Sequence, residues 1–214
     1  MKTVLRLGAQ DVPEVTRVLC EAFYDYPVMR YVVGDQYEDY ERRLRTLVHF
    51  FVTARVLRDE VILGVMDGGA EPEDRSGVLG GVNLSATALV SYPGPRGNPE
   101  ELATLRDGVW NDLGPESRSC YEAFSAACAP FEVEVPHIHL NMIGVTRAAQ
   151  GSGLGRELIE HVHLLSEENR ASHGVTLTTE DPSNVALYKH FGYEVVGHSH
   201  VSSGLETWGF FRPD

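Results

Sequence analysis

The residues best suited to chemistry form a glycine-rich turn, Gly151-Ser152-Gly153-Leu154-Gly155, between an apolar segment and an amphipathic one. Glycine has no Cβ, so such a turn can curl tightly and let an anion approach its main chain. The first N–H groups of a following helix have no partners within that helix and point outward. The turn therefore predicts a site where main-chain donors bind a phosphate group. The alternative is a tight connection between a strand and a helix, without a ligand.

The spacing disfavours two common nucleotide motifs. The turn contains no Lys and does not match G-x-x-x-x-G-K-[ST]. It also differs from G-x-G-x-x-G, which would be expected in the first βαβ unit of a dinucleotide-binding domain. It does match Gln-x-x-Gly-x-Gly, formed by Gln150, Gly153 and Gly155.

That pattern resembles the acetyl-CoA pyrophosphate loop of the GNAT acyltransferase superfamily. Residues 184–193, N-V-A-L-Y-K-H-F-G-Y, resemble the second signature of the same superfamily, N-x-x-x-Y-x-x-x-G-[FY]. Residues 21–27 and 207–213 resemble the first-helix ending and the last strand of its puromycin N-acetyltransferase-like subgroup. The resemblance touches most of the chain, and its specific residues lie between Leu140 and Gly192.

The resemblance implies acetyl-CoA (coenzyme A) as the cofactor, held between two splayed parallel strands over residues 137–145 and 175–179. It implies that the first of these strands pairs with the pantetheine arm, that the turn binds the diphosphate, and that Asn184 hydrogen-bonds the pantetheine region. A helix cap is the alternative role for Asn184. The implied cofactor-binding residues are Ile143, Gly144, Val145, Gln150, Gly151, Ser152, Gly153, Leu154, Gly155, Arg156 and Asn184.

The implied reaction is attack by an amine on a thioester carbonyl, which needs a base for the amine and a proton donor for the departing sulfur. By the resemblance, Tyr188 is the general acid, with a packed core tyrosine as the alternative. Subgroup sequences often read Leu-Glu-Thr where this chain has Leu177-Thr178-Thr179, so Thr178 replaces the usual acid. Glu180, two residues on, is a candidate for the base or for a substrate contact, as are His139 and Asn141, and a solvated strand end is the alternative role for Glu180.

Four further residues are predicted to contact the acceptor. Tyr24 and Asp25 end the first helix, where the family commonly builds its acceptor pocket, and Asp25 could attract a cationic amine. His139 and Asn141 lie on the first splayed strand and are candidates for the base or for substrate contacts. The pairs His137/His139 and His198/His200 lack a third ligand nearby, so no metal site is expected.

Periodicity predicts an α+β fold in α/β/α layers, with a mixed, largely antiparallel sheet flanked by helices. The resemblance implies that the central strands of this sheet splay apart. Strands are expected over residues 4–7, 61–66, 78–84, 137–145, 175–179, 193–200 and 205–211. Helices are expected from residue 11, and over 37–56, 99–113, 116–127, 153–171 and 183–190. Residues 67–74 read as a polar hairpin loop and 91–98 as a loop. With no repeat or linker, residues 1–214 are expected to form a single GNAT-like domain.

Composition narrows the class of partner. The net charge of -13 argues against nucleic acid and an anionic membrane surface. No apolar run approaches a membrane span, and the N-terminus does not resemble a signal peptide, so a cytoplasmic protein is expected. The odd number of cysteines, 3, predicts reduced thiols. A homodimer is an open alternative to a monomer.

The sequence therefore predicts an acetyl-CoA-dependent N-acetyltransferase that acts on an amine of a small molecule. A peptide or polyamine acceptor stays open. A second hypothesis is a non-catalytic module that binds acyl-CoA or a small molecule and has lost its base. A nucleotide- or dinucleotide-binding enzyme is the third.

Overall fold

The computed structural model describes residues 3–66, 84–94, 97, 99–202 and 204–214. Within these residues, strands form one 7-stranded sheet in the order β1-β2-β3-β4-β5-β7-β6. Only β4 and β5 pair in parallel there; the other neighbouring strands are antiparallel. The strands are β1 (Leu5–Leu7), β2 (Val61–Met66), β3 (Leu84–Ser91), β4 (Ile138–Val145), β5 (Gly174–Thr179), β6 (Glu194–Ser202) and β7 (Leu205–Pro213).

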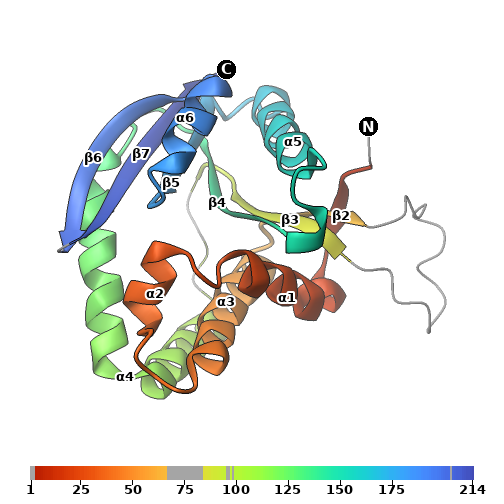
Figure 1. Ribbon diagram of the computed structural model, residues 1–214. Coiled ribbons are helices and arrows are strands. Elements are labelled where there is room, and N and C mark those ends of the chain that lie inside the picture. The colour runs from red at the N-terminus through yellow and green to blue at the C-terminus, as the bar shows by residue number, and fades with distance from the viewer. Residues whose placement is uncertain (1–2, 67–83, 95–96, 98, 203) are drawn as a thin grey trace.

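Helices cover both faces of this sheet (Figure 1). Apolar side chains of α1 to α4 form one core cluster with the first face, and those of α5 and α6 form a second cluster with the opposite face. The expected mixed sheet with helices on both sides is therefore confirmed. The helices are α1 (Val12–Ala22), α2 (Pro27–Val33), α3 (Tyr40–Leu57), α4 (Glu100–Cys128), α5 (Leu154–Glu168) and α6 (Ser183–His190).

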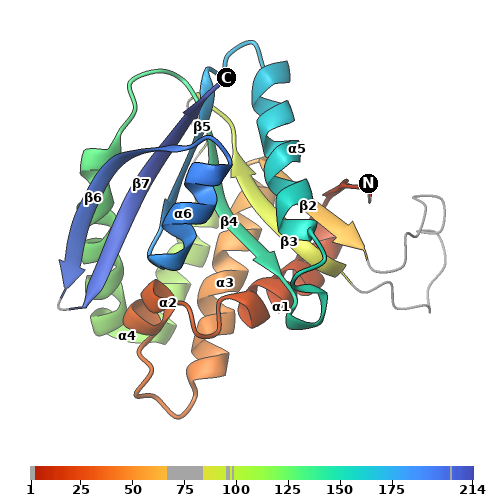
Figure 2. The same ribbon diagram turned by 45° about the horizontal axis from the view of Figure 1, so that its top comes forward.

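The two parallel strands separate along their length. β4 and β5 pair only at Ile138↔Val175, His139↔Thr176 and Leu140↔Leu177. Beyond these pairs β4 runs on to Val145 while β5 moves away from it toward α6 (Figure 2). The main chain of β4 after Leu140 consequently has a strand partner on the β3 side alone among the described residues.

A β-bulge interrupts β4 where the splay begins. Leu89 and Val90 of β3 are consecutive, whereas their partners Met142 and Leu140 are two residues apart, so Asn141 is the extra residue. A bulge bends its strand and re-aims the side chains around it. Here Leu140 joins the cluster under α5, whereas Met142 joins the opposite cluster.

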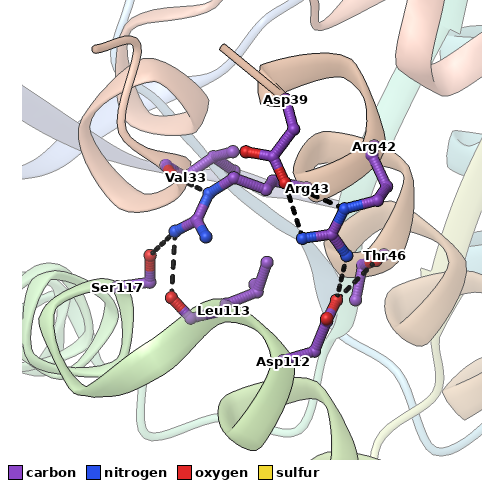
Figure 3. A network of polar contacts seen from close by, with 8 residues as sticks. All are labelled: Val33, Asp39, Arg42, Arg43, Thr46, Asp112, Leu113 and Ser117. Atoms are coloured by element: carbon purple, nitrogen blue, oxygen red, sulfur yellow. Dashed lines mark hydrogen bonds and ion pairs between the residues drawn. The ribbon is translucent and has the colours of Figure 1, made fainter. Parts of the chain in front are cut away.

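Buried Arg43 holds α2, α3 and α4 together on the first face (Figure 3). Its Nε donates to the carbonyl of Val33 at 3.0 Å, and one terminal nitrogen donates to Leu113 O and Ser117 Oγ, each at 2.9 Å. Helix α4 is kinked next to Leu113, because Gly114 has non-helical φ/ψ of 85° and 170° and Pro115 follows. Arg43 thus binds main-chain carbonyls at the end of α2 and at the kink of α4.

Several element predictions are confirmed and two are wrong. The bounds expected for β2 and α6 are the observed ones, and the break expected at residues 114–115 is the kink of α4. Strand β3 runs over Leu84–Ser91, so Ser91, which was expected to begin a loop, belongs to a strand. Helix α2 was not predicted. The expected hairpin loop over 67–74, and residues 78–83, lie outside the described residues.

Among the described residues, no helix is both long enough and apolar enough to cross a bilayer.

Candidate active site

The glycine-rich turn joins β4 to α5. After a 3-10 turn at Arg147–Ala149, Gly151 and Gly153 adopt φ of 77° and 86°, and Gly153 is the N-cap of α5. A Cβ added at either position would meet no heavy atom within 4 Å, so the space beside this main chain is open. The first main-chain bond of α5 runs from Glu157 N to Gly153 O at 3.1 Å, which leaves the N–H groups of Leu154, Gly155 and Arg156 available to a ligand.

Two arginines flank this turn. The Arg147 guanidinium pairs with Asp25 at 3.2 Å, and the main-chain N–H of Arg147 donates to Glu21 at 2.7 Å. Arg156 pairs with Glu160 at 3.7 Å and lies over the Phe191 ring. Both guanidinium groups are exposed, so these ion pairs are weak and the arginines can still turn toward an anion.

A cavity of about 350 Å³ lies beside the splayed strands and is lined by residues of the sheet and of helices α2, α3, α4 and α6. It brings together His139, Asn141 and Ile143 of β4, Glu180 after β5, and Asn184 and Tyr188 of α6. Residues of β4, of the end of β5 and of α6 therefore share one cavity, which Ile143, on the stretch of β4 without a β5 partner, also lines.

Glu180 is a buried carboxyl group with a raised affinity for protons. Its side chain is 5% exposed, and Thr207 Oγ1 donates to its Oε1 at 2.8 Å. Burial raises the pKa of Glu180 to about 7, although hydrogen bonds from Thr207, Tyr26 and Thr178 oppose the rise. A carboxyl group that is half ionised near neutral pH can both accept and release a proton there.

Tyr188 lies on α6 with its ring buried between Tyr193 and Phe210, at centroid distances of 5.9 Å and 5.6 Å. Burial, and then the charge of Glu180, raises the pKa of the Tyr188 hydroxyl to about 12. The phenol therefore keeps its proton at neutral pH and is a hydrogen-bond donor toward the cavity that it lines.

Tyr26 and Thr179 connect the walls of the cavity, and neither was among the predicted site residues. Tyr26 precedes α2, and its hydroxyl accepts a hydrogen bond from the main-chain N–H of Glu180 at 3.0 Å. The same hydroxyl lies 2.8 Å from Thr179 Oγ1, which also accepts a bond from Asn184 Nδ2 at 3.2 Å. The end of β5 is thus tied to α2 on one side and to α6 on the other.

Comparison with known proteins finds acetyltransferases that are similar in sequence or in fold. Residues 119–195 match the family model described as an acetyltransferase (GNAT) domain. An acetyltransferase from Corynebacterium glutamicum, described as histone acetyltransferase HPA2 and related acetyltransferase, superposes with a TM-score of 0.69 and 20% identity over 100% of this chain and 98% of that one. The chain has a GNAT fold, and its residues 119–195 match the acetyltransferase (GNAT) family model.

Two curated relatives are similar in sequence. A 5-NmdU N-acetyltransferase of Pseudomonas phage PaMx11 is 35% identical over 78 residues, which are 36% of this chain and 54% of the phage protein. An uncharacterized N-acetyltransferase of Schizosaccharomyces pombe is 24% identical over 200 residues, or 88% of this chain and 72% of that one. The chain thus spans about half the length of the first relative and about three quarters of the second.

GNAT acetyltransferases use acetyl-CoA as their cofactor. Arabidopsis thaliana NAA60, solved in complex with acetyl-CoA, superposes with a TM-score of 0.55 and 14% identity over 99% of this chain and 97% of that one. The residues here have the properties that such a cofactor needs: open main-chain donors at the turn and an unpaired strand edge at residues 143–145. The splayed pair β4 and β5 is the central part of the GNAT fold of this chain.

The predicted cofactor-binding residues lie on β4, in the glycine-rich turn, at the start of α5 and on α6. Ile143 and Val145 lie on the stretch of β4 that pairs with β3 but not with β5. Gly144 between them packs against α1, where a Cβ would lie 2.9 Å from Ala22 Cβ. Leu154 is buried under the sheet. Asn184 is not the cap of α6, because Pro182 holds that position, and its amide bonds Thr179 instead.

The predicted acceptor residues divide into two groups. His139 and Asn141 line the cavity; His139 Nδ1 lies 2.9 Å from Thr176 Oγ1, and buried Arg55 donates to Asn141 Oδ1 at 2.8 Å. Tyr24 and Asp25 lie outside the cavity lining. Tyr24 packs edge-on against Tyr40, and the exposed carboxylate of Asp25 pairs with Arg30 and Arg147. Within the described residues no cluster suits a metal ion.

Proposed function

We propose that this domain transfers the acetyl group of acetyl-CoA directly to the primary amine of a small molecule, with Glu180 as the base and Tyr188 as the acid. The observation that carries the proposal is that a carboxyl group of pKa about 7 and a protonated phenol line one cavity at the splay of β4 and β5. Direct transfer needs these two groups and no nucleophilic side chain.

Acetyl-CoA bound along the turn and the open edge of β4 would supply a thioester carbonyl at the inner end of the cavity. The groups placed to hold it are the main-chain donors of residues 150–156 and the Asn184 amide beside Thr179. The bulge at Asn141 leaves main-chain groups of β4 outside the sheet ladder near the same point. Such groups can stabilise negative charge on an oxygen.

Glu180 would act on the acceptor. An ordinary alkylammonium has a pKa of about 10, so it must lose a proton before its nitrogen can attack. The buried carboxylate attracts the cation and takes that proton, and its raised pKa makes this transfer less uphill than it would be to an exposed carboxylate. Tyr188 would donate its proton to the departing sulfur, and the second proton that the nitrogen loses on becoming an amide would restore the phenol.

Three observations support a small acceptor over a macromolecule. The cavity is walled by α2, α3 and α4, and much of its lining is aromatic or aliphatic, as in small-molecule sites. The net charge of -13 opposes binding to nucleic acid. Residues 21–27 and 207–213 resemble puromycin N-acetyltransferase-like proteins, which favours an antibiotic or metabolite amine. A cytoplasmic location, and the choice between monomer and homodimer, stay predictions.

Known acceptors of similar proteins differ, so the test needs a broad panel. The phage relative is named for a modified nucleobase, and a Drosophila melanogaster structural neighbour (TM-score 0.59, 15% identity, covering 98% of this chain and 97% of that one) is a polyamine N-acetyltransferase. Release of free thiol from acetyl-CoA should be measured with arylalkylamines, polyamines, nucleosides with an aminomethyl group and short peptides. Turnover of a small amine that Glu180→Gln abolishes supports the proposal. Acetyl-CoA binding without turnover of any amine would favour a binding module instead.

A further inference from the structure

Two arginines line the cavity, and among the described residues one of them has no carboxylate partner. Arg55 and Arg58 lie one turn apart at the end of α3, and both line the cavity. The charge of Arg55 is matched by buried Glu60, whose Oε2 lies 2.9 Å from Arg55 Nε. Arg58 donates from Nε to the carbonyl of Gly97 at 3.2 Å, and among the described residues no carboxylate pairs with it. Within the part of the chain that the structure describes, no hydrogen bond engages the terminal nitrogens of Arg58, so they can bind a ligand.

Glu180, at the end of β5, lines the same cavity. Its charge acts on the hydroxyls of Tyr26 and Tyr188, whose pKa values rise through burial first and the carboxylate second. Burial raises the pKa of Tyr121, which also lines the cavity, and the charges of Arg55 and Arg58 oppose that rise. The base and the unmatched cation thus lie near different walls, the first at the end of β5 and the second at the end of α3.

Much of the cavity lining is apolar and rich in rings. Phe51 of α3 and Tyr121 of α4 lie with ring centroids 6.2 Å apart, and Phe23 packs edge-on against Tyr26 at 4.9 Å. Such walls favour a flat or aliphatic body and offer it few hydrogen bonds. The apolar lining residues include Phe23, Val28, Met29, Leu47, Phe51 and Phe124.

We propose that the acceptor is an amine with an anionic group at its far end, so that its nitrogen lies at Glu180, its apolar or aromatic body lies between Phe23 and Phe51, and its anion lies at Arg58. This inference rests on the proposed function and names the acceptor class. A protein with a net charge of -13 repels anions in general, so an anionic acceptor needs a local cation, which Arg58 provides. A guanidinium binds a carboxylate through paired, charge-assisted hydrogen bonds and so fixes the distance between anion and reacting amine.

The test compares matched amines on the intact protein. Phenethylamine, its para-carboxylate derivative and its para-aminomethyl derivative share one body and differ only in the charge opposite the amine. We expect the wild type to favour the carboxylate over phenethylamine by about tenfold or more in kcat/KM, the size of one charge-assisted contact. In Arg58→Gln this ratio should fall to about 1, and Arg58→Glu should favour the aminomethyl derivative, since an unmatched charge at the site sets the preference.

Arg106→Gln is the matched control, because Arg106 is exposed and pairs only with its neighbour Asp107 among the described residues. It should keep the wild-type ratio. Equal use of the neutral and carboxylate amines by the wild type overturns the inference, as does a ratio unchanged in Arg58→Gln. If polyamines alone are acetylated, the anionic acceptor is wrong and the acetyltransferase proposal stands. If no amine of any charge is acetylated, both fall.

Discussion

The hydroxyl of Tyr26 accepts a hydrogen bond from the main-chain N–H of Glu180 at 3.0 Å, across a separation of 154 residues. This contact joins the start of α2, which forms one wall of the cavity, to the residue proposed as the base. It also bonds Thr179 and, through it, Asn184 of α6. The acceptor wall and the cofactor wall are therefore held in one network, with Tyr26 as a positioning residue.

Tyr26→Phe should shift the pH dependence of turnover. Because the Tyr26 hydrogen bond lowers the pKa of Glu180, its loss should raise that pKa and move the acid limb of kcat/KM to higher pH. At pH 7 we expect about a tenfold loss in kcat/KM. Tyr37→Phe is the control, since it removes an exposed hydroxyl that bonds Glu116. A purely structural role for Tyr26 would lower activity at every pH without shifting the limb.

Glu180→Gln should lower turnover and raise the stability of the folded protein above neutral pH. Turnover should fall by about 100-fold or more, because the base is lost. The pKa of Glu180 in the folded protein is raised from 4.5 to about 7, so the folded state binds more protons than the unfolded state between these values. The wild type therefore loses stability as pH rises through 7, by up to about 3 kcal/mol.

Glutamine cannot ionise and still accepts the Thr207 hydrogen bond, so the variant should unfold at a higher temperature than the wild type at pH 8 and at a similar one at pH 4. Thermal unfolding followed at both pH values tests this. A variant less stable than the wild type at pH 8 would show that the carboxylate is paired and not destabilised by burial.

Tyr188→Phe should lower kcat by about 10- to 100-fold and leave the Kd for acetyl-CoA within about twofold, because only the proton donor is removed. Tyr193→Phe is a close control: Tyr193 contacts the Tyr188 ring, but its hydroxyl bonds His163 at 3.0 Å, and it is absent from the cavity lining. Pre-steady-state turnover and calorimetry separate the two quantities. Equal kcat in wild type and Tyr188→Phe removes Tyr188 from the mechanism.

Gly153→Ala should weaken cofactor binding through the main chain. Gly153 has a φ of 86°, so alanine there costs about 1 to 2 kcal/mol and shifts the donors of the turn. We expect the Kd for acetyl-CoA to rise by about tenfold or more. Gly204→Ala carries the same strain, since Gly204 has a φ of 90° and open space around it, but it lies in the β6–β7 hairpin. An equal change in Kd for both variants would argue against a diphosphate at the turn.

Arg43→Met and Arg42→Met should differ in stability although the residues are neighbours (Figure 3). Loss of Arg43 leaves buried partners on α2 and α4 unbonded, which should cost about 3 kcal/mol in the free energy of unfolding. Arg42 is exposed and pairs with Asp39 and Asp112, so its loss should cost about 1 kcal/mol or less. Urea denaturation measures both, and equal losses would contradict the role assigned to Arg43.

The sequence predicted those parts of the fold whose signals are local. Helix α6 has its observed bounds because Pro182 precedes it and Gly192, with a φ of 85°, follows it. The extent of strand β3 was missed because it is buried on both faces along Leu84–Ser91, even at its polar end residue Ser91, which composition marks as loop. Helix α2 has 7 residues, too few for a clear helical period.

The site was predictable only where a motif marked it. The turn, Asn184 and Tyr188 follow from short patterns in the chain, and Glu180 follows from its place beside them. Tyr26 and Arg58 carry no such mark. Their importance comes from contacts and cavity walls between residues far apart in the sequence, which periodicity and composition do not contain.

The most direct test of the proposed acetyltransferase site is a crystal structure of the protein with coenzyme A. We predict the diphosphate on the main-chain N–H groups of residues 150–156, the pantetheine along residues 143–145 of β4, and the sulfur within hydrogen-bonding distance of the Tyr188 hydroxyl. Coenzyme A bound away from the turn, or with its sulfur outside the cavity that Tyr188 and Glu180 line, would contradict this site.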